Sequence, residues 1–248
     1  MNPTEDLTRV MKKLRLSGLL LTLDMRVQQA CDDDLGHDEF LYRLFNDEVE
    51  RREANQGERR LRRAAFDANK TLEDFDFSFN KSVPKAKVID LAVCTFVARK
   101  ENILLVGKTG VGKSHIAQAI GHRACMAGHS VLYTSANDML LKLRAARADD
   151  TYDRLFAKYA APDLLIIDDL GLRALRYDEP IDLYELIRQR YERGSIILTS
   201  NRAVEEWPPL FKDELLASAA MDRLLHHAHV LVLDGDSYRN PKKRKKAA

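Results

Sequence analysis

The chain has 248 residues, of which 45% are hydrophobic, and its formal net charge is +2. This length allows one sizeable α/β core and a smaller appended unit. No apolar run approaches the roughly 20 residues that span a bilayer, and the acidic start does not resemble a signal peptide. The composition therefore excludes a membrane-spanning class, and we expect a cytoplasmic protein. Three widely spaced cysteines predict reduced thiols used in packing, not a disulfide framework.

The excess positive charge lies at the end of the sequence. Residues 1–80 hold 13 basic and 17 acidic side chains, residues 81–236 hold 21 of each, and residues 237–248 hold six basic and no acidic ones. The charge run predicts that residues 240–248 form a basic disordered tail. Nucleic-acid phosphate is one predicted ligand of this tail, and a solubilising tail without specific contacts is the alternative.

Apolar residues recur at helical spacing from Leu7 to Phe66 and predict about three helices. They would form a small all-α N-terminal domain over residues 1–68. Ser17 and Asp38 are the predicted N-caps of the second and third helices. The third helix continues into an arginine cluster formed by Arg51, Arg52, Arg59, Arg60, Arg62 and Arg63. This cluster predicts either a binding site for the phosphate backbone of a nucleic acid or a solvated helix face with internal ion pairs.

Residues 69–84 are the predicted linker. Phe75, Phe77 and Phe79 alternate with polar residues, which favours an extended segment that lies on the next domain.

Short apolar runs then alternate with longer helical patterns over residues 85–239. The predicted strands are 103–106, 131–134, 164–168, 196–199 and 230–233. The predicted helices are about 113–127, 137–147, 151–160, 179–193 and 204–226. This order predicts the α/β class, with a central parallel five-stranded sheet between helices. Ligands of such sheets bind beyond the carboxyl ends of the strands.

The first strand runs directly into a stretch that fits Gly-x-x-x-x-Gly-Lys-Ser. Its glycines let backbone N–H groups converge on phosphate oxygens, Lys113 reaches the outer phosphates, and Ser114 is a predicted Mg²⁺ ligand. The predicted phosphate-binding residues are Gly107, Lys108, Thr109, Gly110, Val111, Gly112, Lys113 and Ser114. The sequence therefore predicts a nucleoside triphosphate with Mg²⁺. The absence of an Asn/Thr-Lys-x-Asp motif argues against a GTPase.

Polar side chains follow two later strands. Asp168 is predicted to hold Mg²⁺, directly or through water, and Asp169 to polarise the attacking water. Asn201 is predicted to contact both the γ-phosphate and that water. An Asp-rich turn and an ordinary Asn turn are the structural alternatives. Arg223 follows a helical stretch and would neutralise charge on the phosphoryl group of a neighbouring subunit, or else pair with a surface acid such as Asp222.

Several motifs together resemble the IstB type of insertion-sequence helper ATPases. The family lies within the AAA+ superfamily and close to the DnaC-like helicase loaders. The motifs are Lys70 to Phe77, Gly107 to Ser114 with His115, Asp168 to Gly171, Arg190 to Arg193, Thr199 to Arg202, Glu206-Trp207, Asp222 to Ala228 and Gly235 to Arg239. The His-His-Ala after Asp-Arg-Leu and the upstream Trp favour the transposition helper over the loader.

The resemblance implies an AAA+ ATPase that converts ATP to ADP and phosphate. It also implies a homo-oligomeric ring or spiral on duplex DNA, with a transposase of the same element as partner. His115 would belong to the ATP-binding residues, Arg223 would be the arginine finger, and Arg239 a second sensor near the phosphates. The sequence departs from the family pattern at two places. Asp169 stands where many AAA+ proteins have Glu, which implies slow or partner-stimulated hydrolysis. Lys108-Thr109 stands where the phosphate-binding loop of the family commonly has Pro-Pro.

Three alternatives stay open at the level of sequence. A helicase loader would prefer single strands. A small-molecule phosphotransferase would work as a monomer and ignore DNA. A non-hydrolysing interaction module would bind nucleotide without turnover.

Overall fold

The computed structural model describes residues 3–68 and 70–239, so the predicted tail 240–248 lies outside the described residues. The chain divides between Arg59 and Arg60 into two compact units, unit 1 and unit 2. None of the described helices combines the length and apolarity that a bilayer span requires.

Unit 1 contains α1 (Pro3–Lys13), α2 (Ser17–Asp32) and the first part of α3 (His37–Ala64). The helical spacing of its apolar residues arises because they pack around a small core of Met11, Leu19, Leu23 and Leu44.

The predicted N-caps of these helices are wrong. Helices α2 and α3 begin at Ser17 and His37, so Ser17 and Asp38 lie inside the first turns. Leu16 occupies the N-cap position of α2 and provides no side-chain cap. The backbone N–H of Gly18 donates instead to the Glu48 carboxylate at 2.5 Å. A carboxylate from α3 therefore satisfies a helix-start donor that the sequence assigned to a local cap.

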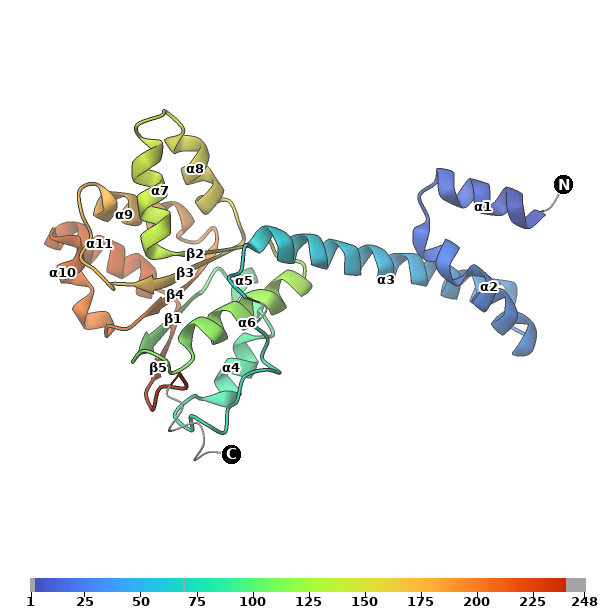
Figure 1. Ribbon diagram of the computed structural model, residues 1–248, viewed down its shortest axis with the longest axis horizontal. Helices are drawn as coiled ribbons and strands as arrows, with labels where there is room; N and C mark the ends of the chain where they lie inside the picture. Colours follow the sequence, from blue (N-terminus) through green and yellow to red (C-terminus); the bar gives the residue numbers. More distant parts are fainter. Residues whose placement is uncertain (1–2, 69, 240–248) are drawn as a thin grey trace. The chain divides into compact units, whose positions relative to one another are not determined.

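In the described part of unit 2, five parallel strands form one sheet in the order β2-β3-β4-β1-β5 (Figure 1). The strands are β1 (Asn102–Gly107), β2 (Val131–Ser135), β3 (Leu164–Leu170), β4 (Ser195–Ser200) and β5 (Ala228–Leu233). The predicted α/β class and five-stranded parallel sheet are confirmed. The carboxyl ends of β1, β3 and β4 meet at one edge, and this arrangement brings their following loops together.

Helices cover both faces of the sheet (Figure 1). The helices of unit 2 after α3 are α4 (Lys85–Leu91), α5 (Thr95–Ala98), α6 (Lys113–Met126), α7 (Ala136–Ala146), α8 (Tyr152–Ala160), α9 (Glu179–Arg190), α10 (Pro208–Phe211) and α11 (Glu214–Leu225), with a 3₁₀ turn at Val204–Glu206. Neighbouring strand residues alternate between the faces: Leu104 packs with α7 to α11, whereas Ile103 packs with α4 to α6. Burial on both faces explains why β1, β3 and β4 contain continuous apolar runs, whereas the edge strand β5 exposes Val230 and Val232.

The sequence did not predict α4 and α5, which precede β1. Residues 70–84 form turns and not an extended strand, although Phe75 and Phe77 pack on unit 2 as expected. Among the cysteines, Cys94 and Cys125 are packed in the core, and burial raises the pKa of the Cys94 thiol to about 11. Cys31 is exposed, so its predicted packing role is wrong.

Candidate nucleotide-binding site

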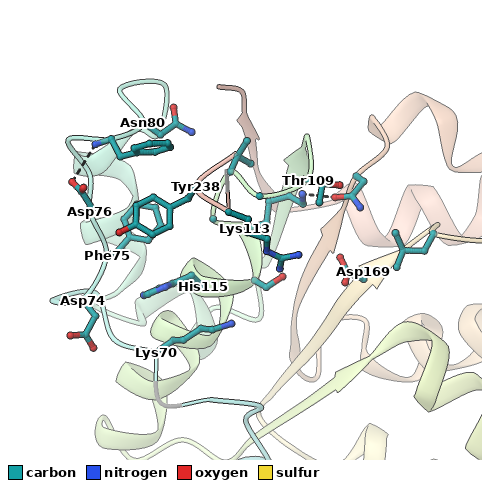
Figure 2. A pocket seen from close by; sticks show the side chains of 18 residues that line it. Lys70, Asp74, Phe75, Asp76, Asn80, Thr109, Lys113, His115, Asp169 and Tyr238 are labelled. Atoms are coloured by element: carbon teal, nitrogen blue, oxygen red, sulfur yellow. Dashed lines mark hydrogen bonds between the residues drawn. The ribbon is translucent and has the colours of Figure 1, made fainter. Parts of the chain in front are cut away.

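A cavity of about 440 Å³ opens at the carboxyl edge of the sheet. The predicted residues that line it are Thr109, Gly110, Val111, Gly112, Lys113, Ser114, His115, Asp169, Asn201 and Arg239. Figure 2 shows Asp169 at one end of this cavity, Phe75 and Asn80 at the other, and Lys113 between them. Gly107, Lys108, Asp168 and Arg223 do not line it.

The phosphate-binding loop connects β1 to α6 and depends on glycine at two positions. Gly110 and Gly112 have φ angles of +85° and +104°, which side chains with a Cβ rarely adopt. A Cβ at Gly110 would lie 2.0 Å from Ser237 Oγ, and one at Gly112 would lie 2.6 Å from the Phe75 ring. The loop is therefore enclosed by side chains from both ends of unit 2. Gly112 is the N-cap of α6, whose positive helix end favours an anion at the loop.

Lys113 is held in place by three oxygen acceptors. Its Nζ donates to the carbonyls of Gly107 at 2.7 Å and Lys108 at 2.8 Å, and to Asn201 Oδ1 at 2.5 Å. Only 5% of Lys113 is exposed. Burial lowers the pKa of Lys113, and the nearby carboxylates of Asp169 and Asp168 oppose that effect. The loop therefore holds the ammonium group of Lys113 in a buried position, bonded to two backbone carbonyls and the Asn201 side chain.

Asp168 lies inside β3, where a hydroxyl group donates to each of its carboxylate oxygens. Tyr133 Oη donates to Oδ2 at 2.7 Å, and Thr199 Oγ1 donates to Oδ1. These contacts come from β2 and β4, the strands on either side of β3. Asp168 is 5% exposed, and Asp169, the next residue, lines the cavity.

Asp169 follows at an irregularity of β3 that interrupts its pairing with β4 between Ile167 and Leu170. Its φ angle is +59°, in the left-handed region. Its backbone N–H donates to Thr199 Oγ1 at 2.9 Å. Consecutive strand residues would normally face opposite ways. The irregularity instead sends Asp169 into the cavity while Asp168 stays with Tyr133. Burial raises the pKa of the Asp169 carboxyl, and Asp168 adds to that effect.

Several other residues that line the cavity were not assigned a role from the sequence. They are Lys70, Asp74, Phe75, Asp76, Phe79, Asn80, Leu172 and Tyr238. The rings of Phe79 and Tyr238 pack edge to face with centroids 4.9 Å apart, and Phe75 packs similarly on His115 at 5.2 Å. Aromatic rings are surfaces on which a nucleobase can stack. The alternating phenylalanines of residues 75–79 were the available signal.

The segment from Asp234 to Arg239, here called the C-terminal strap, crosses the phosphate-binding loop. The backbone N–H of Tyr238 donates to the Gly110 carbonyl at 3.0 Å. Lys108 Nζ forms an ion pair with Asp234 at 2.9 Å. The strap therefore attaches to the loop at two points and brings Arg239 to the cavity. It also gives Lys108 a partner at a position where the resemblance led us to expect proline.

Arg223 lies away from this cavity. Its Nη1 donates to the Ala219 carbonyl at 2.8 Å, within α11. The side-chain amide of Asn102, at the start of β1, donates to the carbonyl of Leu224, the residue after Arg223, at 3.0 Å. Strand β5 then begins at Ala228. Arg223 is therefore at the amino edge of the sheet, opposite the carboxyl edge that carries the cavity. It cannot contact a ligand in the cavity of its own chain.

The fold and the phosphate-binding loop define the class of protein, an α/β P-loop nucleotide-binding protein. Solved structures support the fold. DnaI matches with a TM-score of 0.59 at 21% identity, over 67% of this chain and 92% of that chain. A replication initiator DnaA bound to AMPPCP and single-stranded DNA matches with a TM-score of 0.58 at 24% identity. That match covers 69% of this chain and 52% of DnaA.

The chain belongs to the IstB-like ATP-binding proteins, whose family model matches residues 9–247. An insertion-sequence ATP-binding protein of Mycobacterium tuberculosis is 42% identical over 96% of this chain and 95% of its own length. The ATP-binding protein of insertion sequence IS21 from Pseudomonas aeruginosa is 36% identical over 97% of this chain and 91% of its own length. The resemblance seen in the sequence motifs is confirmed.

Proposed function

We propose that this protein is an ATPase that assembles on duplex DNA and delivers or selects target DNA for the transposase of the same element. One observation carries the proposal. The cavity collects Lys113, Asp169, Asn201 and Arg239 in one chain, while Arg223 lies at the opposite edge of the sheet. Such a site is completed when a second subunit supplies its arginine.

In the proposed complex, the triphosphate lies on the backbone amides of the phosphate-binding loop and on Lys113. The base extends toward Phe75, Phe79 and Tyr238, which form the apolar end of the cavity. Arg239, at the end of the C-terminal strap, would contact the phosphates as the second sensor. This orientation follows from the positions of the phosphate-binding loop and Lys113 relative to the aromatic rings, because the loop amides and the Lys113 ammonium group attract the phosphates.

Mg²⁺ fits the donor set of this site. Ser114 lines the cavity and offers a hydroxyl, and the buried carboxylate of Asp168 would hold the ion directly or through water. Mg²⁺ prefers oxygen ligands, usually one or two carboxylates together with phosphates and water. When bound, Mg²⁺ would neutralise charge on the phosphate oxygens. Asp169 would orient the attacking water, and its raised pKa makes it a better proton acceptor. Asn201 would hold the γ-phosphate and the same water.

Assembly would follow from the position of Arg223. An arginine that contacts the γ-phosphate of a neighbour stabilises the ATP-bound contact, and loss of that phosphate removes the stabilisation. ATP would therefore favour the ring or spiral, and hydrolysis would favour its release. Either the basic residues of the sequence beyond Arg239 or the arginine cluster of α3 would contact DNA phosphates. The transposase partner is proposed because the relatives belong to insertion sequences.

A subunit-mixing experiment tests the shared site. Lys113→Ala should abolish nucleotide binding, whereas Arg223→Ala should bind ATP but neither assemble nor hydrolyse it. Mixing the two inactive proteins should restore part of the turnover, because an intact loop then meets an intact Arg223. Phosphate release measures turnover, and electron microscopy with duplex DNA under ATP and ADP measures assembly.

Arg188→Ala is the matched control, since Arg188 is an exposed arginine that pairs with Glu185. It should behave as wild type without mixing. Wild-type turnover and assembly by Arg223→Ala alone would refute the shared site. Parallel titrations with duplex and single-stranded DNA separate a transposition helper from a helicase loader, because the loader would prefer single strands.

A further inference from the structure

Tyr133 links two carboxylates that lie far apart in the sequence. Its hydroxyl oxygen is 2.7 Å from Asp67 Oδ2 and 2.7 Å from Asp168 Oδ2. Asp67 follows the end of α3, and Asp168 lies in β3. Tyr133 and Asp168 are both buried, whereas Asp67 is exposed. The three groups therefore connect the surface of unit 2 with the proposed magnesium ligand.

The geometry makes the two carboxylates competitors. A phenol carries one hydroxyl proton, so Tyr133 can donate to only one carboxylate at a time. Burial raises the pKa of Tyr133, and its hydrogen bonds to Asp168 and Asp67 add to that effect, so the proton stays on the phenol. When Tyr133 donates to Asp168, part of the charge on Oδ2 is compensated. When it donates to Asp67, that oxygen keeps its full charge.

Local packing holds Asp67 in this arrangement. The ring of its neighbour Phe66 packs against Tyr133 with centroids 6.2 Å apart. Phe66 also contacts the core formed by α6 and the sheet. The other oxygen of Asp168 has an independent donor, Thr199, which does not contact Asp67. The hydrogen-bonded path from Asp67 to Asp168 therefore runs through the Tyr133 hydroxyl.

We infer that Asp67 is a positioning residue for Asp168, which it controls by competing for the hydroxyl proton of Tyr133. The inference rests on the proposed role of Asp168 as a magnesium ligand. By drawing the proton away, Asp67 increases the negative charge that Asp168 presents to the cation. An exposed side chain thus sets the strength of a buried ligand.

A double-mutant cycle tests the inference. The readout is the Mg²⁺ concentration that gives half-maximal binding of a fluorescent, non-hydrolysable ATP analogue, supported by Mn²⁺ titration followed by electron paramagnetic resonance. In Asp67→Ala, the hydroxyl proton stays with Asp168, so the half-maximal Mg²⁺ concentration should rise about threefold to tenfold, the range expected for the net contribution of a typical hydrogen bond. Asp67→Asn should shift it the same way, because its amide donates to the phenol oxygen.

The decisive comparison is made in the Tyr133→Phe background, where Asp67→Ala should have no further effect. Asp90→Ala, at an exposed carboxylate of α4, is the control and should leave the Mg²⁺ requirement unchanged. An equal shift with and without the Tyr133 hydroxyl would overturn the inference, as would no shift in folded Asp67→Ala and Asp67→Asn. If wild type shows no Mg²⁺-dependent nucleotide binding, the proposed function itself fails. Melting temperatures establish that each variant folds.

Discussion

At the scale of single residues, Asp169 shows how a backbone irregularity produces a catalytic geometry. Two adjacent carboxylates on a regular strand would face opposite sides of the sheet. The left-handed conformation of Asp169 places its side chain in the cavity, and its N–H is satisfied by the same Thr199 hydroxyl that donates to Asp168. One threonine therefore supports both acids.

Asp169→Asn should separate nucleotide binding from hydrolysis. Asparagine tolerates the left-handed backbone and has the same shape, but its amide cannot accept a proton. We expect ATP affinity close to that of wild type and turnover reduced by at least about 100-fold, the usual contribution of a general base. Fluorescent-nucleotide titration and phosphate release measure the two quantities. Asp153→Asn, at an exposed aspartate of α8, serves as the control, and undiminished turnover in Asp169→Asn would rule out the proposed role.

Local motifs predicted the central residues of the candidate site from the sequence. The glycine pattern, the acids after an apolar run and Asn201 after the next strand depend on short spacings. Tyr133 has no such spacing, because the sheet order brings it to the site. Asp67 is likewise distant from its partner Asp168 in the sequence. Long-range packing, which a single sequence does not encode in any local pattern, supplies this part of the site.

At the scale of elements, Arg190 fastens α9 to its neighbours. It is the last residue of α9 and is 1% exposed. Its guanidinium donates to the carbonyls of Ala160 at 2.8 Å and Ser195 at 2.7 Å, with longer bonds to Tyr159 and Asp163. It thus satisfies the end of α8 and the start of β4. Burial lowers the pKa of Arg190 to about 10. The first arginine of the Arg-Tyr-Glu-Arg motif, Arg190, therefore has a structural role.

Arg190→Ala should destabilise unit 2 by about 3 to 5 kcal/mol, because several buried carbonyls lose a charged donor. Arg190→Lys should cost less, since an ammonium group retains the charge but not the planar fork. Urea unfolding followed by circular dichroism measures the free energy of unfolding. Arg188→Ala on the same helix should cost under about 1 kcal/mol, because its ion pair with Glu185 is exposed. Similar losses at both positions would show that Arg190 is not a fastening point.

The elements themselves were predicted unevenly for the same reason. The central strands β1, β3 and β4 are buried on both faces and have strong apolar runs, and the edge strands β2 and β5 were also found in the sequence. Helices α4 and α5 are short and were missed. The start of α2 was assigned to the wrong cap, since Glu48 from α3 supplies the acceptor. The ends of helices and the short helices are determined by contacts with neighbouring elements, which a sequence pattern does not contain. The long buried strands are recognised from their own apolar composition.

At the scale of the whole molecule, charge is balanced over most of the chain and concentrated beyond residue 236. Several exposed arginines of α3 already have partners: Arg52 pairs with Glu48, and Arg51 donates to Ser17. These internal contacts favour the solvated-face interpretation of the arginine cluster. The five basic residues of the sequence from Lys242 to Lys246 are then the stronger source of attraction for DNA.

Replacing those five basic residues with glutamine should weaken duplex binding and its dependence on salt. The slope of the logarithm of affinity against the logarithm of salt concentration should become less negative by about four, as expected for the loss of five phosphate contacts. Fluorescence anisotropy at a series of salt concentrations measures the slope. Glutamine at Arg59 and Arg63 is the comparison and should change it less. A larger change from the α3 variants would assign DNA binding to the helix.

The C-terminal strap also has a consequence for how the protein is made. The ribosome completes the phosphate-binding loop long before it reaches Ser237, Tyr238 and Arg239, which close one wall of the cavity. A nascent chain therefore carries the whole glycine motif while its binding site still lacks that wall. Full nucleotide affinity would therefore arise only when translation of the strap is finished.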